Sequence, residues 1–144
     1  MKIRYMAGDQ VVQGVSSGSF ILTNKGGSFY YGNENTRYGG WFVKDKNKLY
    51  RVLSKINVNG PTINLLEDNL YSIERTKGNV NERFFMPLKL PALVYSINAE
   101  QDIDLLFDIK EIFDNREWGR YYDVTERGDL SIIKFQKKND FREH

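Results

Sequence analysis

Four residues of this 144-residue chain have side chains that could recognise a sugar: Asn24, Arg37, Tyr38 and Trp41. An asparagine amide can hydrogen-bond to sugar hydroxyls, and an arginine can bind a planar oxyanion through two hydrogen bonds. A tyrosine or tryptophan ring can stack on the apolar face of a pyranose. These four residues are therefore the candidate substrate-binding positions. The alternative is structural: Arg37 braces loop carbonyls, and the aromatic rings belong to the core or to a face between domains.

The chain offers few groups for catalysis. It has no cysteine and one histidine, the terminal His144, which argues against thiolate nucleophiles, sulfur-ligated zinc and mechanisms that need an ordered imidazole. Asp102, Asp104 and Asp108 lack the central glycine and terminal glutamate of a calcium loop, so they indicate a solvated strand face. A glycosidase pair of carboxyl groups remains open, but no spacing identifies one. We therefore predict no catalytic residue, no metal site and no cofactor.

Two glycine pairs and one aromatic segment have weaker functional interpretations. The pairs at 26–27 and 39–40 lack the Lys-Ser/Thr of a phosphate-binding loop, and they predict turns. Residues 27–31 are distantly similar to an RNA-binding strand but lack its basic start. The formal net charge of +2, from 21 basic and 19 acidic residues, gives no strong field for nucleic acid. An RNA-binding module is thus the least favoured alternative, and we expect no nucleic-acid partner.

Length and hydropathy indicate one soluble domain. A chain of 16.9 kDa is long enough for a single core, which we place at residues 1–134, with residues 135–144 as a polar tail or a truncated linker. The N-terminus lacks the apolar segment of a signal peptide, and no run approaches the roughly 20 apolar residues that span a bilayer. We expect a cytoplasmic location and no membrane partner.

Short β-branched and aromatic runs between glycines predict an all-β fold, an antiparallel β-sandwich of the supersandwich kind with short or no helices. The expected strands are Ile3–Met6, Ser19–Thr23, Ser28–Tyr31, Trp41–Lys44, Leu49–Ile56, Thr62–Leu66, Tyr71–Thr76, Glu82–Met86, Ala92–Asn98, Asp102–Phe113, Arg120–Thr125 and Leu130–Gln136.

The segment Asp102–Phe113 has the clearest periodicity. Ile103, Leu105 and Phe107 alternate with polar residues, which predicts a strand with one buried and one solvated face. A helix is the alternative, but it would place Lys110 in the apolar stripe. The preceding run 93–97 alternates in the same way, so we expect a turn at 98–101 to join the two strands as a hairpin.

Three stretches of the chain form a recognisable pattern: Leu22-Thr23-Asn24 with Gly26-Gly27 and Thr36-Arg37-Tyr38-Gly39, then Leu49–Lys55, and finally Asp114-Asn115-Arg116 with Gly119-Arg120-Tyr121-Tyr122 and Val124. These stretches resemble the N-terminal domain of bacterial and archaeal glycogen debranching enzymes of the amylo-α-1,6-glucosidase type. Many family members have a histidine after the tyrosine, where this chain has Gly39, so no role of that histidine is carried over.

The resemblance implies a twisted β-sandwich that precedes a helical barrel, with the catalytic acids on the barrel. This chain would then be a noncatalytic module that packs on the helical domain in cis and helps shape the α-glucan cleft, while the parent protein would be the glycoside hydrolase. Without its partner, the module is expected to expose an apolar patch and to self-associate. The alternative is a stand-alone carbohydrate-binding sandwich.

Overall fold

The structure is a computed structural model, which describes residues 12–14, 19–33, 36–60, 63–68 and 72–138. These residues form strands and turns, with no helix among them, and they fall into two compact units, 1–111 and 112–144. The predicted strand Ile3–Met6 and His144 lie outside the described residues. The strands are β1 Val12–Gly14, β2 Phe20–Thr23, β3 Phe29–Gly32, β4 Gly40–Asp45, β5 Lys48–Val58, β6 Ile63–Asp68, β7 Ser72–Lys77, β8 Val80–Phe85, β9 Val94–Ile97, β10 Ile103–Glu111, β11 Arg120–Arg127 and β12 Leu130–Lys137.

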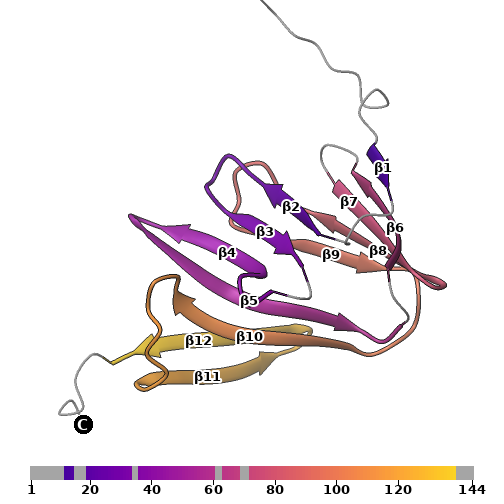
Figure 1. The fold of residues 1–144 in the computed structure, drawn as a ribbon. Coiled ribbons are helices and arrows are strands. Elements are labelled where there is room, and N and C mark those ends of the chain that lie inside the picture. The colour runs from indigo at the N-terminus through magenta and orange to yellow at the C-terminus, as the bar shows by residue number, and fades with distance from the viewer. Residues whose placement is uncertain (1–11, 15–18, 34–35, 61–62, 69–71, 139–144) are drawn as a thin grey trace, which may run out of the picture. The chain divides into compact units, whose positions relative to one another are not determined.

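The first unit contains two antiparallel five-stranded sheets (Figure 1). One has the order β1-β6-β7-β8-β9 and the other β10-β5-β4-β3-β2. Both sheets contribute to one apolar core, so the predicted β-sandwich is confirmed. The buried core residues are Phe20, Leu22, Tyr30, Leu53, Ile56, Val58, Ile73, Phe84 and Met86.

The ring of Phe84 lies at the centre of this core. Its centroid is 4.9 Å from that of Phe20 and 5.3 Å from that of Tyr30, both on the opposite sheet, and 5.0 Å from that of Tyr95 on the neighbouring strand. Along β8, inward and outward side chains alternate, so Phe84 is buried and Phe85 is exposed. Aromatic contacts between the inner faces therefore join the two sheets.

The predicted hairpin between residues 93–97 and 102–113 is wrong. β9 pairs with β8 in one sheet and β10 pairs with β5 in the other, so the chain crosses between sheets at 98–102. At the crossing, the Asn98 amide donates to the Asn81 carbonyl (3.2 Å), and the Asn98 side chain accepts from the Asn81 amide (2.7 Å). These bonds hold the end of β9 on β8. The eleven-residue β5 offers β10 a longer partner than the four residues of β9.

The predicted strand over β10 is present, but its predicted buried face is wrong. Ile103, Leu105, Leu106 and Phe107 are all at least 37% exposed. The strand lies at the edge of its sheet, and its pairing with β5 shifts register on either side of Phe107. Register shifts of this kind interrupt the alternation of faces, so periodicity alone could not place these side chains.

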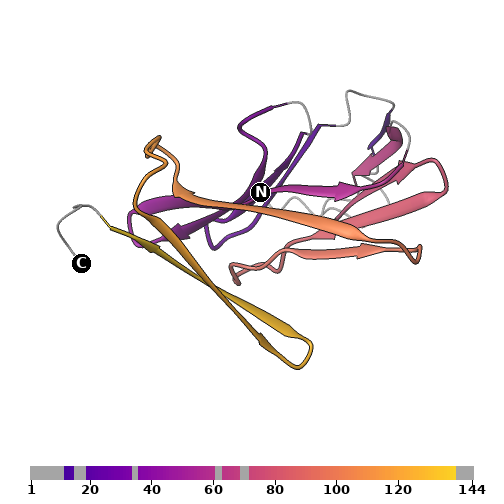
Figure 2. The ribbon, with the colours of Figure 1, turned by 90° about the horizontal axis from the view of Figure 1, so that it is seen from below.

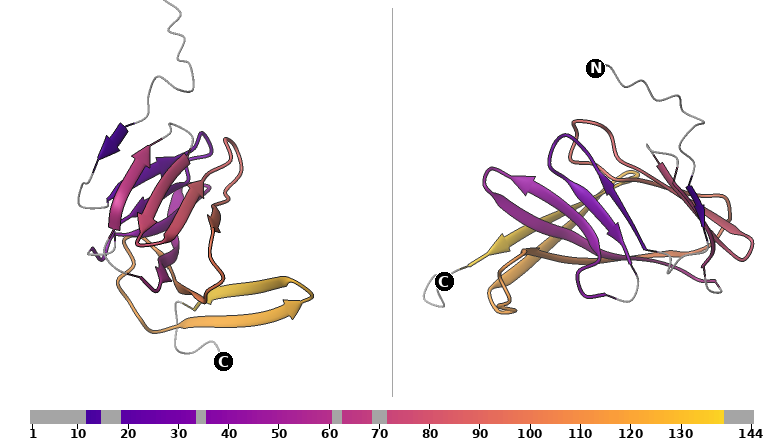
Figure 3. Two further views of the ribbon diagram at one scale, coloured as in Figure 1. Left: turned by 90° about the vertical axis from the view of Figure 1, so that its right-hand side faces the viewer. Right: turned by 45° about the horizontal axis from the view of Figure 1, so that its top comes forward.

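The second unit contains the two-stranded sheet β11–β12, coloured orange to yellow in Figure 3. The two strands, both predicted, pair from Arg120 with Lys137 to Arg127 with Leu130. Figure 2 shows the strong twist of this ribbon, which is usual for two strands without further neighbours. β12 continues to Lys137, past the start of the tail expected at residue 135.

Candidate functional site

Asn24 lies at the turn between β2 and β3, and its polar side-chain atoms contact the backbone. Its Nδ2 donates to the carbonyls of Pro87 (3.0 Å) and Leu90 (2.8 Å), and its Oδ1 accepts from the amide of Ser28 (3.1 Å). The neighbouring Lys25 amide donates to the Leu88 carbonyl at 2.9 Å. The asparagine thus ties the Gly-Gly turn to the loop that follows β8.

Arg37 and Tyr38 lie together in the loop before β4. Arg37 Nη2 donates to the Tyr38 hydroxyl at 2.6 Å, and its guanidinium carbon is 4.8 Å from the centroid of the Tyr38 ring. The loop is held from β5, where Arg51 donates to the Arg37 carbonyl at 2.7 Å and also pairs with Asp108. Tyr38 is 60% exposed, so this pair is accessible to solvent.

Trp41 lies on β4, opposite Tyr30 on one side and Leu53 on the other. Its ring is partly buried against the core, and its indole Nε1 is buried without a hydrogen-bond acceptor. The structure therefore brings Arg37 and Tyr38 into contact, whereas it gives Asn24 a role in a turn and Trp41 a role in packing.

A buried polar network on β7, β8 and β9 was not predicted from the sequence. Arg75 donates from Nε and Nη2 to the two carboxylate oxygens of Glu82 at 2.6 and 2.7 Å, and the Tyr95 hydroxyl donates to Glu82 at 2.8 Å. The side chains of the ion pair are 1% and 0% exposed. Burial, together with the adjacent Glu82 carboxylate, raises the pKa of Tyr95 far above its usual value. Glu82 lies two residues before Phe84 on β8, so both side chains point to the buried face of the strand. This alternation was the sequence signal from which the burial of Glu82 could have been predicted.

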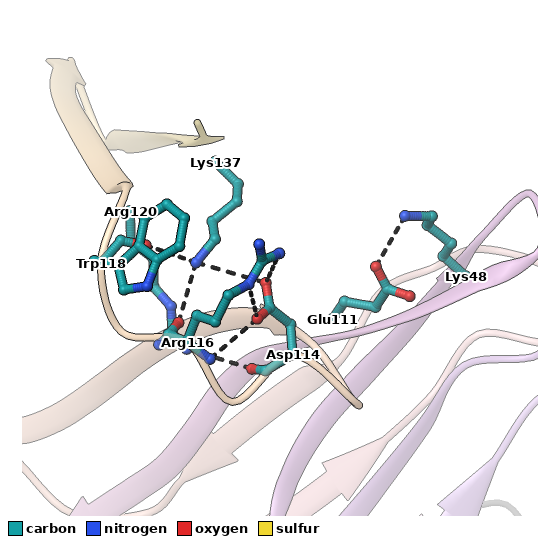
Figure 4. Close-up of polar contacts among 7 residues, drawn as sticks. All are labelled: Lys48, Glu111, Asp114, Arg116, Trp118, Arg120 and Lys137. Carbon is teal, nitrogen blue, oxygen red and sulfur yellow. Dashed lines mark hydrogen bonds and ion pairs between the residues drawn. The ribbon is translucent and has the colours of Figure 1, made fainter. Parts of the chain in front are cut away.

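A second polar cluster closes the loop before β11 (Figure 4). Asp114 accepts from Arg116 at Nε (2.8 Å), at Nη2 (3.1 Å) and at the backbone amide (3.0 Å). Lys137 Nζ donates to the carbonyls of Arg116 (3.0 Å) and Trp118 (2.7 Å), and it lies 3.5 Å from Asp114. Both cations also lie near the Trp118 ring, at 5.2 and 5.4 Å from its centroid.

This cluster keeps Asp114 ionised. Its hydrogen bonds from Arg116, with a smaller contribution from Lys137, hold the pKa of the carboxyl well below its usual range. A general acid in glycoside hydrolysis needs the opposite shift, because it must carry a proton near neutral pH. The arrangement is suited to fixing the loop on the base of the hairpin. Among the described residues, no group of three or more His, Cys, Asp or Glu side chains could hold a metal ion.

The β11–β12 hairpin carries apolar side chains on both faces. The strand register places Tyr122 opposite Phe135 and Val124 opposite Ile133, on the same face. The Tyr122 and Phe135 rings are 5.5 Å apart between centroids, and Val124 is 58% exposed. The opposite face carries Asp123 and Lys134 as a cross-strand pair, together with the exposed apolar side chains of Tyr121, Leu130 and Ile132.

No family model, curated protein or solved structure matches this chain. Its class is defined by its own architecture, an antiparallel β-sandwich with an additional hairpin. The part of the chain that the structure describes contains no helix long and apolar enough to cross a membrane.

Proposed function

We propose that this chain is the noncatalytic β-sandwich module of a glycogen-debranching-type α-1,6-glucosidase. The module packs on a helical catalytic domain and helps to shape the glucan cleft, in the cytoplasm. Two features support this function: the resemblance of three stretches of the sequence, given above, and the β-sandwich fold, which is the fold that the resemblance implies.

Exposed apolar side chains on each of the two units are the observation that carries the proposal. In the first unit they lie along β10, and in the second unit they lie on both strands of the hairpin. Apolar side chains that cluster at the surface in this way mark interaction sites. The exposed residues on these strands are Ile103, Leu105, Leu106, Phe107, Tyr121, Tyr122, Val124, Leu130 and Ile132.

Two of the described carboxylates, Glu82 and Asp114, are unsuited to acid catalysis of hydrolysis. Glu82 is fully buried and paired with Arg75, so a substrate cannot reach it. Asp114 is held ionised by Arg116 and cannot donate a proton near neutral pH. The resemblance implies that the hydrolytic acids lie on the helical domain.

Calorimetric titration with maltooligosaccharides and a branched glucan, together with a debranching assay, tests this function. The expected result is no hydrolysis by the chain alone. Hydrolysis would overturn the noncatalytic role. Binding of glucan to the isolated chain, lost in a Tyr38→Ala variant that still folds, would instead favour the alternative of a carbohydrate-binding sandwich.

A further inference from the structure

The outer face of β8 and β9 holds a depression of about 250 Å³, which we call the β8–β9 depression. It is lined by Arg83 and Phe85 of β8 and by Val94 and Ser96 of β9, whose side chains point away from the core. Drug-sized ligands occupy sites of about 300–1,000 Å³, so this volume suits a smaller ligand of one ring. β9 ends the order of its sheet, and no other described strand pairs with its outer edge.

One half of the β8–β9 depression is apolar. Phe85 and Val94 lie directly opposite each other in the strand register and are 37% and 48% exposed. A single exposed apolar residue is ordinary, whereas a cross-strand pair that lines a depression gives a ligand a continuous apolar surface. An aromatic ring in this position can stack on the apolar face of a sugar ring.

The other half is polar and offers both donors and acceptors. Arg83 lies between Ser96 on β9 and Glu74 on β7. Its Nε is 3.8 Å from Glu74 Oε1, and the two side chains are 61% and 47% exposed, so the ion pair is loose and costs little to rearrange. A guanidinium only donates, a carboxylate only accepts, and a serine hydroxyl does both. Neighbouring hydroxyl groups on one ring can satisfy all three.

The charges around the β8–β9 depression favour a neutral ligand. Glu67 on β6 lies opposite Glu74, so this row of the sheet carries two carboxylates and one guanidinium. An anion therefore finds no excess of positive charge. A cation would lie against Arg83, which is the charged side chain lining the depression. A ligand with hydroxyl groups and no charge avoids both penalties.

We infer that the β8–β9 depression binds one pyranose unit of a neutral saccharide. Phe85 stacks on the apolar face of the ring, and Arg83, Ser96 and Glu74 form hydrogen bonds with its hydroxyl groups. This site goes beyond the proposed function, which assigns no ligand to this face, and it needs no helical domain. It is also separate in sequence from Arg37 and Tyr38, which precede β4 in the other sheet.

Nuclear magnetic resonance titration of the isotopically labelled full chain tests the site. The probes are maltotriose and the methyl glycosides of glucose, galactose and mannose. At least one should bind with a dissociation constant of about 1 mM, because one ring is stacked at an open surface. The amide shifts should centre on Arg83, Phe85, Val94 and Ser96. No shift with any probe, or shifts centred on Tyr38, would overturn the inference and leave the assay of hydrolysis, which tests the proposed function, unaffected.

Two exposed phenylalanines provide a matched pair of variants. Phe85→Ala should weaken binding about tenfold or more, because it removes the stacking ring. Phe107, 40% exposed on β10 of the other sheet, is the control, and Phe107→Ala should change the affinity less than about twofold. Equal effects of the two variants would overturn the inference. Circular dichroism checks each fold, and Ser96→Lys, which fills the depression from β9, replaces Phe85→Ala if that variant unfolds.

The preference for a neutral ligand has its own readout. The methyl glycoside of glucuronic acid differs from that of glucose by a carboxylate in place of the hydroxymethyl group. It should bind no more tightly than the neutral glycoside, because Glu74 and Glu67 offset the charge of Arg83. Tighter binding of the anionic glycoside would contradict the assignment of a neutral saccharide.

Discussion

At the scale of single residues, close backbone approaches limit what the sandwich tolerates. Gly40 starts β4 with φ of 122°, and a Cβ atom there would overlap the carbonyl oxygen of Leu53 on β5. Only glycine adopts this conformation without strain. Gly128, in the β11–β12 turn, also has positive φ (59°), but a Cβ there would meet no atom within 4 Å.

These two glycines make a matched pair of variants. Gly40→Ala should lower the free energy of unfolding by about 2–4 kcal/mol, from the backbone strain and the clash together. Gly128→Ala should lower it by about 1 kcal/mol, from the conformation alone. Urea denaturation of both variants measures the difference, and equal losses would contradict the geometry at Gly40.

The buried ion pair predicts a second contrast. Glu82→Gln leaves the Arg75 guanidinium without its charge partner inside the sandwich, and should cost about 3–5 kcal/mol of stability. Glu74 and Arg83 lie on the same two strands as an exposed pair at 3.8 Å, so Glu74→Gln should cost less than about 1 kcal/mol. Similar denaturation midpoints for the two variants would show that Glu82 does not have the role assigned here.

At the scale of elements, the Asp114 cluster makes the base of the hairpin sensitive to acid. Because the pKa of Asp114 is lowered in the folded state, its carboxylate stabilises the fold fully at any pH above the ordinary aspartate pKa, near 3.9. This stabilisation is lost as the pH falls from that value toward the lower pKa of the folded state. Protonation removes the carboxylate that Arg116 and Lys137 contact, so Trp118 becomes more accessible.

Acrylamide quenching of Trp118 fluorescence in a Trp41→Phe background measures this change. Quenching should stay at its neutral-pH level as the pH falls through the ordinary aspartate range, because Asp114 remains ionised there, whereas a further Asp114→Asn change should give a raised level already at neutral pH. A rise in quenching centred near pH 4 in the Trp41→Phe background, or no effect of Asp114→Asn at neutral pH, would contradict the account of the cluster.

Sequence patterns predicted where most of the strands lie. The β-branched runs between glycines identified them, because the alternation of residue types in β2 and β8 follows the alternation of buried and exposed side chains. The pairing of β9 and β10 was wrong, because neighbours in the sequence suggested a hairpin and only the three-dimensional structure shows which sheet each strand joins. Among the site residues, Arg37 and Tyr38 contact each other. Asn24 has one local partner, Ser28, but its two other partners are 63 and 66 residues away and leave no local pattern.

At the scale of the whole molecule, the exposed apolar residues predict self-association when no partner is present. The isolated chain should show a concentration-dependent increase in sedimentation coefficient, because burial of apolar side chains between copies is favourable. Leu105→Lys and Val124→Lys, each at an exposed position, should reduce it. A monomer at all concentrations would count against an uncovered docking surface.

The affinity of the wild-type chain for the helical domain of a glycogen-debranching-type glucosidase tests the central claim most directly. We expect a one-to-one complex with a dissociation constant of about 10 μM or lower, as for a domain interface of ordinary size. The absence of any complex at concentrations tenfold higher, with a correctly folded chain and domain, would contradict the proposed role.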